Sequence, residues 1–164
     1  MPAGEVLAIV DALGNREVAV WIGGGWAVDA LVGEQTRPHR DLDLAIRAEH
    51  LDAAIDRLAG LDYRPALDLR PVRLVLESGG GPSIDLHPVT FDEAGHGRQP
   101  GDDGRVFDYP PDAFGEGTIA GVTVPCLTAG QLVRFHLGYE PQAHDRHDMN
   151  LLRGRLGIAL PDPY

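Results

Sequence analysis

The sequence predicts a mixed α/β (α+β) domain in which helices flank a central sheet of parallel and antiparallel strands. Three observations support this fold class. The chain has 164 residues, which is the length of one domain. Apolar residues follow helical spacing in some segments and strand spacing in others. Several strand-like runs lie too close together for helical crossovers, so part of the sheet must be antiparallel.

The first half of the chain alternates between the two patterns. Residues 2–14 place apolar side chains at helical spacing and stop at Gly14. After it we expect a buried strand at 18–22, a glycine turn at 23–25, a short helix at 26–31, a period-two strand at 41–46 and an amphipathic helix at 48–58.

The second half predicts more strands and two final helices. The expected strands lie at 63–69, 72–77 and 84–87, and a hairpin joins 118–119 to 122–124. The polar, glycine-rich tract 90–104 predicts a surface loop over the site. Thr128 and Asp145 are expected to cap helices that reach Leu137 and Leu156. We therefore expect a main domain at 1–125 and a C-terminal helical segment, 126–164, packed on it.

The composition excludes several classes of function. The chain has 25 acidic and 14 basic residues and a net charge of −11, which argues against nucleic-acid and membrane partners and favours a cationic substrate. All the basic residues are arginine, so mechanisms that need a lysine are excluded. A single cysteine, Cys126, rules out a disulfide framework and suits the cytoplasm. We expect no signal peptide and no membrane span.

Three acidic residues form the first chemical motif. Asp41 and Asp43 alternate with Leu42 and Leu44, so both carboxylates should share one face of a strand while the leucines enter the core. Asp85 has the same setting on another strand. Carboxylates at close range repel each other unless a cation lies between them, and oxygen ligands select hard ions such as Mg²⁺.

A glycine turn forms the second motif. Gly24 and Gly25 lie between a predicted strand and a predicted helix, where backbone N–H groups can approach phosphate oxygens. Arg37 and Arg40 lie close by in the sequence and can neutralise phosphate charge. A phosphate cradle beside a metal-binding pair predicts phosphoryl or nucleotidyl transfer.

The sequence resembles the small lincosamide nucleotidyltransferases of the DNA polymerase beta-type superfamily, and it is also similar to the aminoglycoside 2″-adenylyltransferases. Four segments carry most of the resemblance: Gly-Gly-Trp-Ala-Val-Asp (24–29), Thr-Arg-Pro-His-Arg-Asp-Leu-Asp (36–43), Asp-Leu-His-Pro (85–88) and Arg-Phe-His-Leu-Gly-Tyr (134–139). Val-Pro-Cys-Leu (124–127), Asp145 and Asp148 extend it almost to the end of the chain.

The resemblance implies a nucleotidyltransferase fold in the main domain and transfer of AMP from ATP to an antibiotic hydroxyl. It implies Mg²⁺, as two ions, on Asp41 and Asp43, with Asp85 as a third metal ligand or as the base. The implied nucleotide-binding residues are Gly24, Gly25, Thr36, Arg37, His39 and Arg40. The candidate substrate residues are Arg73, His87, His136, Tyr139 and Glu140. Asp29 is expected to support His39 or Arg37, and the chain is expected to form a homodimer.

The acceptor remains open between two antibiotic classes. A lincosamide is preferred because the segment 134–140 is aromatic and apolar and carries one acid, whereas an aminoglycoside needs several carboxylates. The alternatives are an aminoglycoside adenylyltransferase and a protein-AMPylating enzyme of a toxin–antitoxin pair. A nucleotide-binding module without catalysis is disfavoured by the intact carboxylates.

Overall fold

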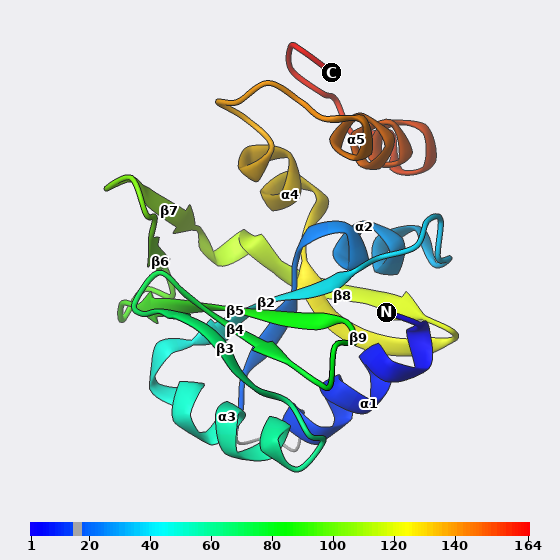
Figure 1. Ribbon diagram of the computed structural model, residues 1–164. Coiled ribbons are helices and arrows are strands. Elements are labelled where there is room, and N and C mark those ends of the chain that lie inside the picture. The colour runs from blue at the N-terminus through cyan, green and yellow to red at the C-terminus, as the bar shows by residue number, and fades with distance from the viewer. Residues whose placement is uncertain (15–17) are drawn as a thin grey trace.

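A computed structural model describes residues 1–14 and 18–164 of the chain. Within these residues, nine strands form one sheet, seven of them in the order β3-β4-β5-β2-β1-β9-β8 (Figure 1). These strands are β1 (Val20–Ile22), β2 (Asp41–Arg47), β3 (Arg64–Leu69), β4 (Arg73–Glu77), β5 (Ser83–Phe91), β8 (Phe114–Ile119) and β9 (Val122–Leu127). The remaining strands, β6 (Gly97–Pro100) and β7 (Val106–Tyr109), form a hairpin that extends from β5.

Helices cover both faces of this sheet. Helices α1 (Ala3–Leu13) and α3 (Leu51–Ala59) lie on one face, and α2 (Gly24–Val32), α4 (Ala129–Phe135) and α5 (Ala143–Leu156) lie on the other (Figure 1). Two short 3-10 turns, η1 (Ala48–His50) and η2 (Pro111–Ala113), complete the elements. The predicted mixed sheet is confirmed, because β2 pairs with β5 and β1 with β9 in parallel while the other pairs are antiparallel.

The register of β2 and β5 determines where the site lies. Asp43 is opposite Asp85 in this parallel pair. The alternating aliphatic residues of both strands are fully buried: Leu42, Leu44, Ile84 and Leu86. Strand alternation therefore sends the carboxylates to the opposite face, which is the face that carries α2, α4 and α5. This arrangement is the one that the alternation in the sequence predicted.

The predicted surface loop at 90–104 is wrong in part. Strand β5 continues to Phe91, and Gly97–Pro100 pairs with it and with β7. Gly97 permits this close packing, because a Cβ at this position would lie 2.6 Å from Val89 Cγ1. The polar composition concealed a hairpin whose strands have only four residues each.

The capping predictions for the last two helices also need correction. Thr128 occupies the N-cap position of α4, but its hydroxyl donates to the Asp112 carbonyl and accepts no hydrogen bond from the helix N–H groups. The N-cap of α5 is Gln142, and Asp145 is the third helical residue of a capping box with it. Helix α2 begins at Gly24, inside the segment predicted as a turn.

The structure adds two facts on overall organisation. Strand β9 runs to Leu127, so the C-terminal helices begin after it, and the division of the chain at residue 125 remains a prediction. Among the described residues, no helix combines the length and the apolar composition that crossing a bilayer requires.

Candidate active site

The glycine turn between β1 and α2 lies directly against the acidic strand. Gly24 has a φ of +53°, and a Cβ there would lie 2.0 Å from Asp43 Oδ2. A Cβ at Gly25 would lie 2.2 Å from Arg37 Nη2. Both positions therefore require glycine, the first for its backbone conformation and both for the space they leave. The start of α2 and the carboxylate of Asp43 consequently face the same small space.

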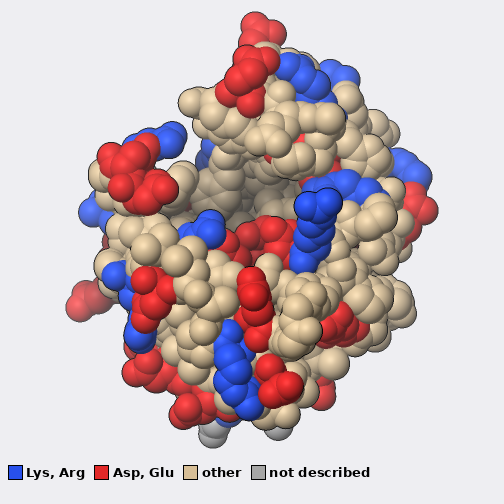
Figure 2. Space-filling view, in the orientation of Figure 1, with Lys and Arg blue, Asp and Glu red and all other residues tan. Residues whose placement is uncertain are grey.

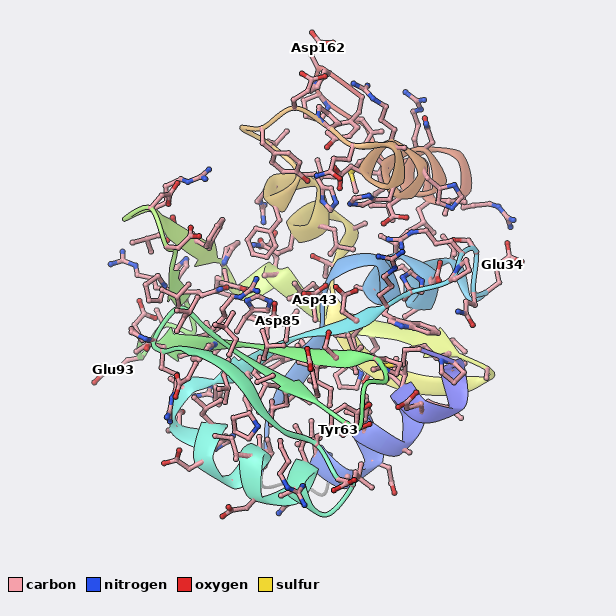
Figure 3. The ribbon with its side chains drawn as sticks, in the orientation of Figure 1. Glu34, Asp43, Tyr63, Asp85, Glu93 and Asp162 are labelled. Atoms are coloured by element: carbon pink, nitrogen blue, oxygen red, sulfur yellow. The ribbon has the colours of Figure 1, made fainter. Side chains whose placement is uncertain are left out.

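The acidic cluster is formed by β2 and β5. Ligand atoms of Asp43, Asp85 and His87 all lie within 4.8 Å of one another. Figure 3 shows Asp43 and Asp85 side by side on the sheet, below α4. Asp41 lies two residues before Asp43 on the same face of β2 and is exposed. Arg73 on β4 contacts the cluster from the side, with Nη1 3.2 Å from Asp85 Oδ2.

The environment of Asp85 favours the protonated form of its carboxyl group. Burial raises the pKa of its carboxyl group, His87 and Arg73 oppose this, and repulsion from Asp43 adds to it. A raised pKa increases the affinity of a carboxylate for a proton, as a general base requires.

His87 lies between the acidic cluster and the β6–β7 hairpin. Its Nε2 lies 3.3 Å from Asp43 Oδ1, and its Nδ1 lies 3.1 Å from Gln99 Nε2. Burial disfavours the charged ring, but the hydrogen bond with Asp43 and the charges of Asp43 and Asp85 together raise the pKa of His87. The N–H of Gln99 faces Nδ1 and opposes its protonation, whereas Asp43 favours the protonated ring.

A second buried network of hydrogen bonds lies next to the glycine turn and joins Asp29, Thr36 and His39. Asp29, on α2, accepts hydrogen bonds from the backbone N–H and the hydroxyl of Thr36, at 3.1 and 2.6 Å. Its other oxygen lies 2.5 Å from His39 Nε2. Burial alone would raise the pKa of Asp29, but the hydrogen bonds with His39 and Thr36 outweigh it and lower the pKa. The predicted support of His39 by Asp29 is therefore present in the structure.

Arg37 links this region to the last helix. Its guanidinium donates to both carboxylate oxygens of Asp148, at 2.9 and 2.6 Å. The hydrogen bonds with Asp148 raise the pKa of Arg37 further. Asp148 is buried, so this paired geometry orders a residue of the 33–40 loop against α5.

Two pockets meet above the acidic cluster. The polar pocket has a volume of about 500 Å³ and is lined by Gly24, Gly25, Arg37, Pro38, His39, Arg40, Asp41, Asp43, His136, His144, Asp145 and Asp148. The apolar pocket has a volume of about 250 Å³ and is lined by Gly23, Gly24, Asp43, Ala45, His87, Gln99, Phe107, Tyr109, Leu127, Leu132, Phe135 and His136. Figure 2 shows this hollow, with acidic side chains on its floor and basic ones on either side. Gly24, Asp43 and His136 line both pockets.

Most of the residues predicted for the site come together here. Five of the six predicted nucleotide-binding residues line the polar pocket, and the sixth, Thr36, adjoins it through Asp29. His87 and His136 line the apolar pocket, and Arg73 reaches Asp85. Tyr139 and Glu140 lie outside both linings. Glu140 forms an exposed ion pair with Arg146.

The structure adds residues that the sequence did not indicate. Gln99, Phe107 and Tyr109 reach the apolar pocket from the β6–β7 hairpin, whose first strand lies in the tract 90–104 that we had expected to be a loop. The alternation in Val-Phe-Asp-Tyr (106–109) was the available signal, but four residues make it weak.

The residues present fit a divalent metal ion. The Oδ1 atom of Asp85 is buried and, within the described chain, has no hydrogen-bond partner. An orphaned carboxylate oxygen that faces a second carboxylate is costly without a cation. The atoms that Asp41, Asp43 and Asp85 offer to a metal ion are all carboxylate oxygens, which suits Mg²⁺.

A glycine turn, a carboxylate cluster and a polar pocket on one face of the sheet define the active site of a nucleotidyltransferase. The sequence family described as Aminoglycoside-2''-adenylyltransferase matches residues 5–152, and the chain belongs to this family. The predicted enzyme class and the fold class are both confirmed.

Individual relatives agree with this assignment. The chain is 30% identical over 149 residues to a lincosamide resistance protein of Staphylococcus haemolyticus, covering 91% of this chain and 92% of that protein. It is 32% identical over 134 residues to a 2''-aminoglycoside nucleotidyltransferase of Klebsiella pneumoniae, covering 74% and 63% respectively. The crystal structure of lincosamide antibiotic adenylyltransferase LnuA with lincomycin bound superposes with a TM-score of 0.84 at 28% identity, covering 94% of this chain and 98% of that chain.

Proposed function

We propose that this protein transfers AMP from ATP to a hydroxyl group of a lincosamide antibiotic. The observation that carries the proposal is the junction of the two pockets at Asp43. A polar pocket with arginine and histidine side chains suits a triphosphate, and an apolar pocket suits an amphiphilic acceptor. At this junction the α-phosphate and the acceptor hydroxyl would both lie beside the same carboxylates.

The nucleotide is assigned to the polar pocket. The backbone at Gly24 and Gly25 and the side chains of Arg37 and Arg40 face the space that the triphosphate would fill. His39 is fixed by Asp29 and Arg37 by Asp148, so both side chains are positioned before the nucleotide binds. Bound Mg²⁺, held by Asp41 and Asp43, would neutralise the triphosphate charge, which leaves Asp85 to act as the base.

The reaction that we propose is a single displacement. The acceptor oxygen forms a bond to the α-phosphorus of ATP, and the bond from that phosphorus to the pyrophosphate oxygen breaks. Asp85 takes the proton of the acceptor hydroxyl, for which its raised pKa is suited. The products are the adenylylated antibiotic and pyrophosphate.

The choice of a lincosamide depends on the lining of the apolar pocket. Asp43 is its only carboxylate among the lining residues, and six other members are aliphatic or aromatic: Ala45, Phe107, Tyr109, Leu127, Leu132 and Phe135. A lincosamide has one basic amine and an apolar tail, whereas an aminoglycoside carries several ammonium groups that need several acids. The likeness to LnuA, whose structure contains lincomycin, supports the same choice.

The test is a matrix of donors and acceptors. Purified protein is mixed with Mg²⁺ and each of ATP, GTP, CTP and UTP, together with lincomycin, clindamycin or kanamycin, and products are identified by mass. We expect AMP on the two lincosamides. Transfer to kanamycin alone would replace this proposal with the aminoglycoside reaction, which the family assignment favours as the second candidate.

Assembly and location remain predictions. We propose a cytoplasmic homodimer, since a second copy adds a wall to a site that one small chain encloses incompletely. Light scattering of the pure protein tests the dimer, and a monomer with full activity would contradict it.

A further inference from the structure

Gln99 lines the apolar pocket and belongs to none of the motifs described above. It is buried, with 6% of its surface exposed. Its side chain has three neighbours: the Val72 carbonyl 3.3 Å from Nε2, His87 Nδ1 3.1 Å from Nε2, and the Tyr109 hydroxyl 2.6 Å from Oε1. Within the described residues, Gln99 is the one side chain of the β6–β7 hairpin that forms a hydrogen bond with His87, and His87 in turn contacts Asp43.

These neighbours determine which way the amide points. The carbonyl of Val72 can only accept a hydrogen bond, so the NH₂ group of Gln99 must face it. The Tyr109 hydroxyl then donates to the amide oxygen, as its distance indicates. The same NH₂ group also faces His87, so Nδ1 of that ring must accept.

An accepting Nδ1 determines the tautomer of His87. A neutral imidazole carries one proton, and if Nδ1 accepts, the proton is on Nε2. That N–H points towards the carboxylates, with Nε2 3.3 Å from Asp43 Oδ1 and 3.8 Å from Asp85 Oδ1. A nitrogen that carries a proton cannot coordinate a metal ion through the same position. The spacing of Asp43, Asp85 and His87 alone would have suggested a three-residue metal site.

We propose that Gln99 is a positioning residue that holds His87 in the Nε2–H form, so that His87 donates a hydrogen bond to Asp43 and does not bind the metal ion. The donated hydrogen bond fixes the orientation of the Asp43 carboxylate. The catalytic importance of this tautomer rests on the proposed function, whereas the tautomer itself does not.

The direct test is a long-range ¹H–¹⁵N correlation spectrum of the ¹⁵N-labelled full chain. It is recorded at a pH where the His87 ring is neutral, with His87→Asn identifying its signals. We expect the Nε2–H pattern in the wild type. The matched variant Gln99→Glu replaces the donor with an acceptor of the same shape, so we expect the proton to appear on Nδ1. A wild-type ring protonated on Nδ1, or a Glu variant with an unchanged pattern, would overturn the proposal.

A second measurement reads out the metal site. In Gln99→Glu the unprotonated Nε2 becomes available as a ligand, and nitrogen ligands favour Zn²⁺ over Mg²⁺. We expect the ratio of Zn²⁺ to Mg²⁺ affinity, measured by calorimetry, to rise about tenfold or more. Tyr109→Phe is the control, since it keeps both donors of Gln99 and should leave the ratio unchanged. An unchanged ratio in the Glu variant counts against the proposal.

Kinetics separate this inference from the proposed function. Gln99→Met removes the donor while keeping the size of the side chain, and we expect kcat to fall about tenfold with little change in KM for ATP. A protein that transfers AMP with unchanged kcat in Gln99→Met refutes the positioning role alone. A wild type that shows the expected tautomer but no AMP transfer refutes the proposed function alone.

Discussion

The polar and apolar pockets share Gly24, Asp43 and His136 but are built in different ways. The polar pocket draws most of its lining from one stretch, Gly24 to Asp43, and is completed by α5. The apolar pocket draws on β5, the β6–β7 hairpin, β9 and α4, so its residues are far apart in the sequence. The pocket proposed for ATP is therefore formed mainly by one continuous stretch of the chain. The pocket proposed for the acceptor is assembled only when distant segments fold together.

The largest effect is expected where the two pockets meet. Asp43→Asn removes a charge that both sides use, and we expect turnover to fall by about a thousandfold or more. Asp41→Asn should behave in the same way. Steady-state assays with ATP and lincomycin measure the loss, and circular dichroism checks the fold.

Asp108→Asn is the matched control for these variants. Asp108 is an exposed strand aspartate, 3.8 Å from an exposed Arg98, and its replacement should leave turnover unchanged. If Asp43→Asn retained near-wild-type turnover in Mg²⁺, the assignment of the metal site would be wrong.

The polar pocket can be disturbed separately through Gly25. In Gly25→Ala the new methyl group would lie 2.2 Å from Arg37 Nη2 and 2.7 Å from His39 Cε1, so both side chains must move. We expect KM for ATP to rise about tenfold or more, with KM for the acceptor unchanged. Gly130→Ala, on α4 with open space around it, is the control. Equal loss for both substrates would show that the pockets are not separable.

The apolar pocket offers the converse test. Phe135 packs edge-on against Tyr109 and Phe107, with ring centroids 5.0 and 5.7 Å apart. Phe135→Ala should lower kcat/KM for lincomycin about tenfold to a hundredfold and leave KM for ATP unchanged. Leu137→Ala, at a position that is 40% exposed and outside the pocket, should have no effect. A larger loss for ATP than for lincomycin would reverse the assignment of the two pockets.

The smallest expected effect is on stability, through the hydrogen bonds of Asp29 with Thr36 and His39. The folded-state pKa of Asp29 is lowered, so its charged form stabilises the fold above the unfolded-state pKa, and this contribution is lost as pH falls through the folded-state value. Asp29→Asn should cost about 1–3 kcal/mol of unfolding free energy at pH 7.

Urea unfolding at several pH values measures this difference. The gap between wild type and Asp29→Asn should shrink below about pH 4, where the aspartate of the unfolded chain is itself protonated. A gap that stays constant down to pH 3 would mean that the charge of Asp29 does not carry the effect.

The same contrast explains what the sequence could predict. Asp41, Asp43 and Asp85 could be placed because strand alternation assigns each side chain to a face without further information. Gln99, Phe107 and Tyr109 could not, because the hairpin that carries them pairs with the distant end of β5. Tyr139 and Glu140 were predicted in the acceptor site from their place in the turn between the last two helices. The helix ends at Phe135, and the side chain of Tyr139 lies beside His136, with ring centroids 6.4 Å apart, without lining either pocket.

The bond between Arg37 and Asp148 has a consequence for how the enzyme is made. These residues are 111 positions apart, and all three carboxylates of the cluster precede the second by more than 60 residues. The residues of the acidic cluster are therefore synthesised before α5. Until α5 is synthesised, the polar pocket lacks one wall and Arg37 lacks Asp148 as its partner. We expect the growing polypeptide to acquire ATP affinity only when its last helix folds back onto the loop before β2.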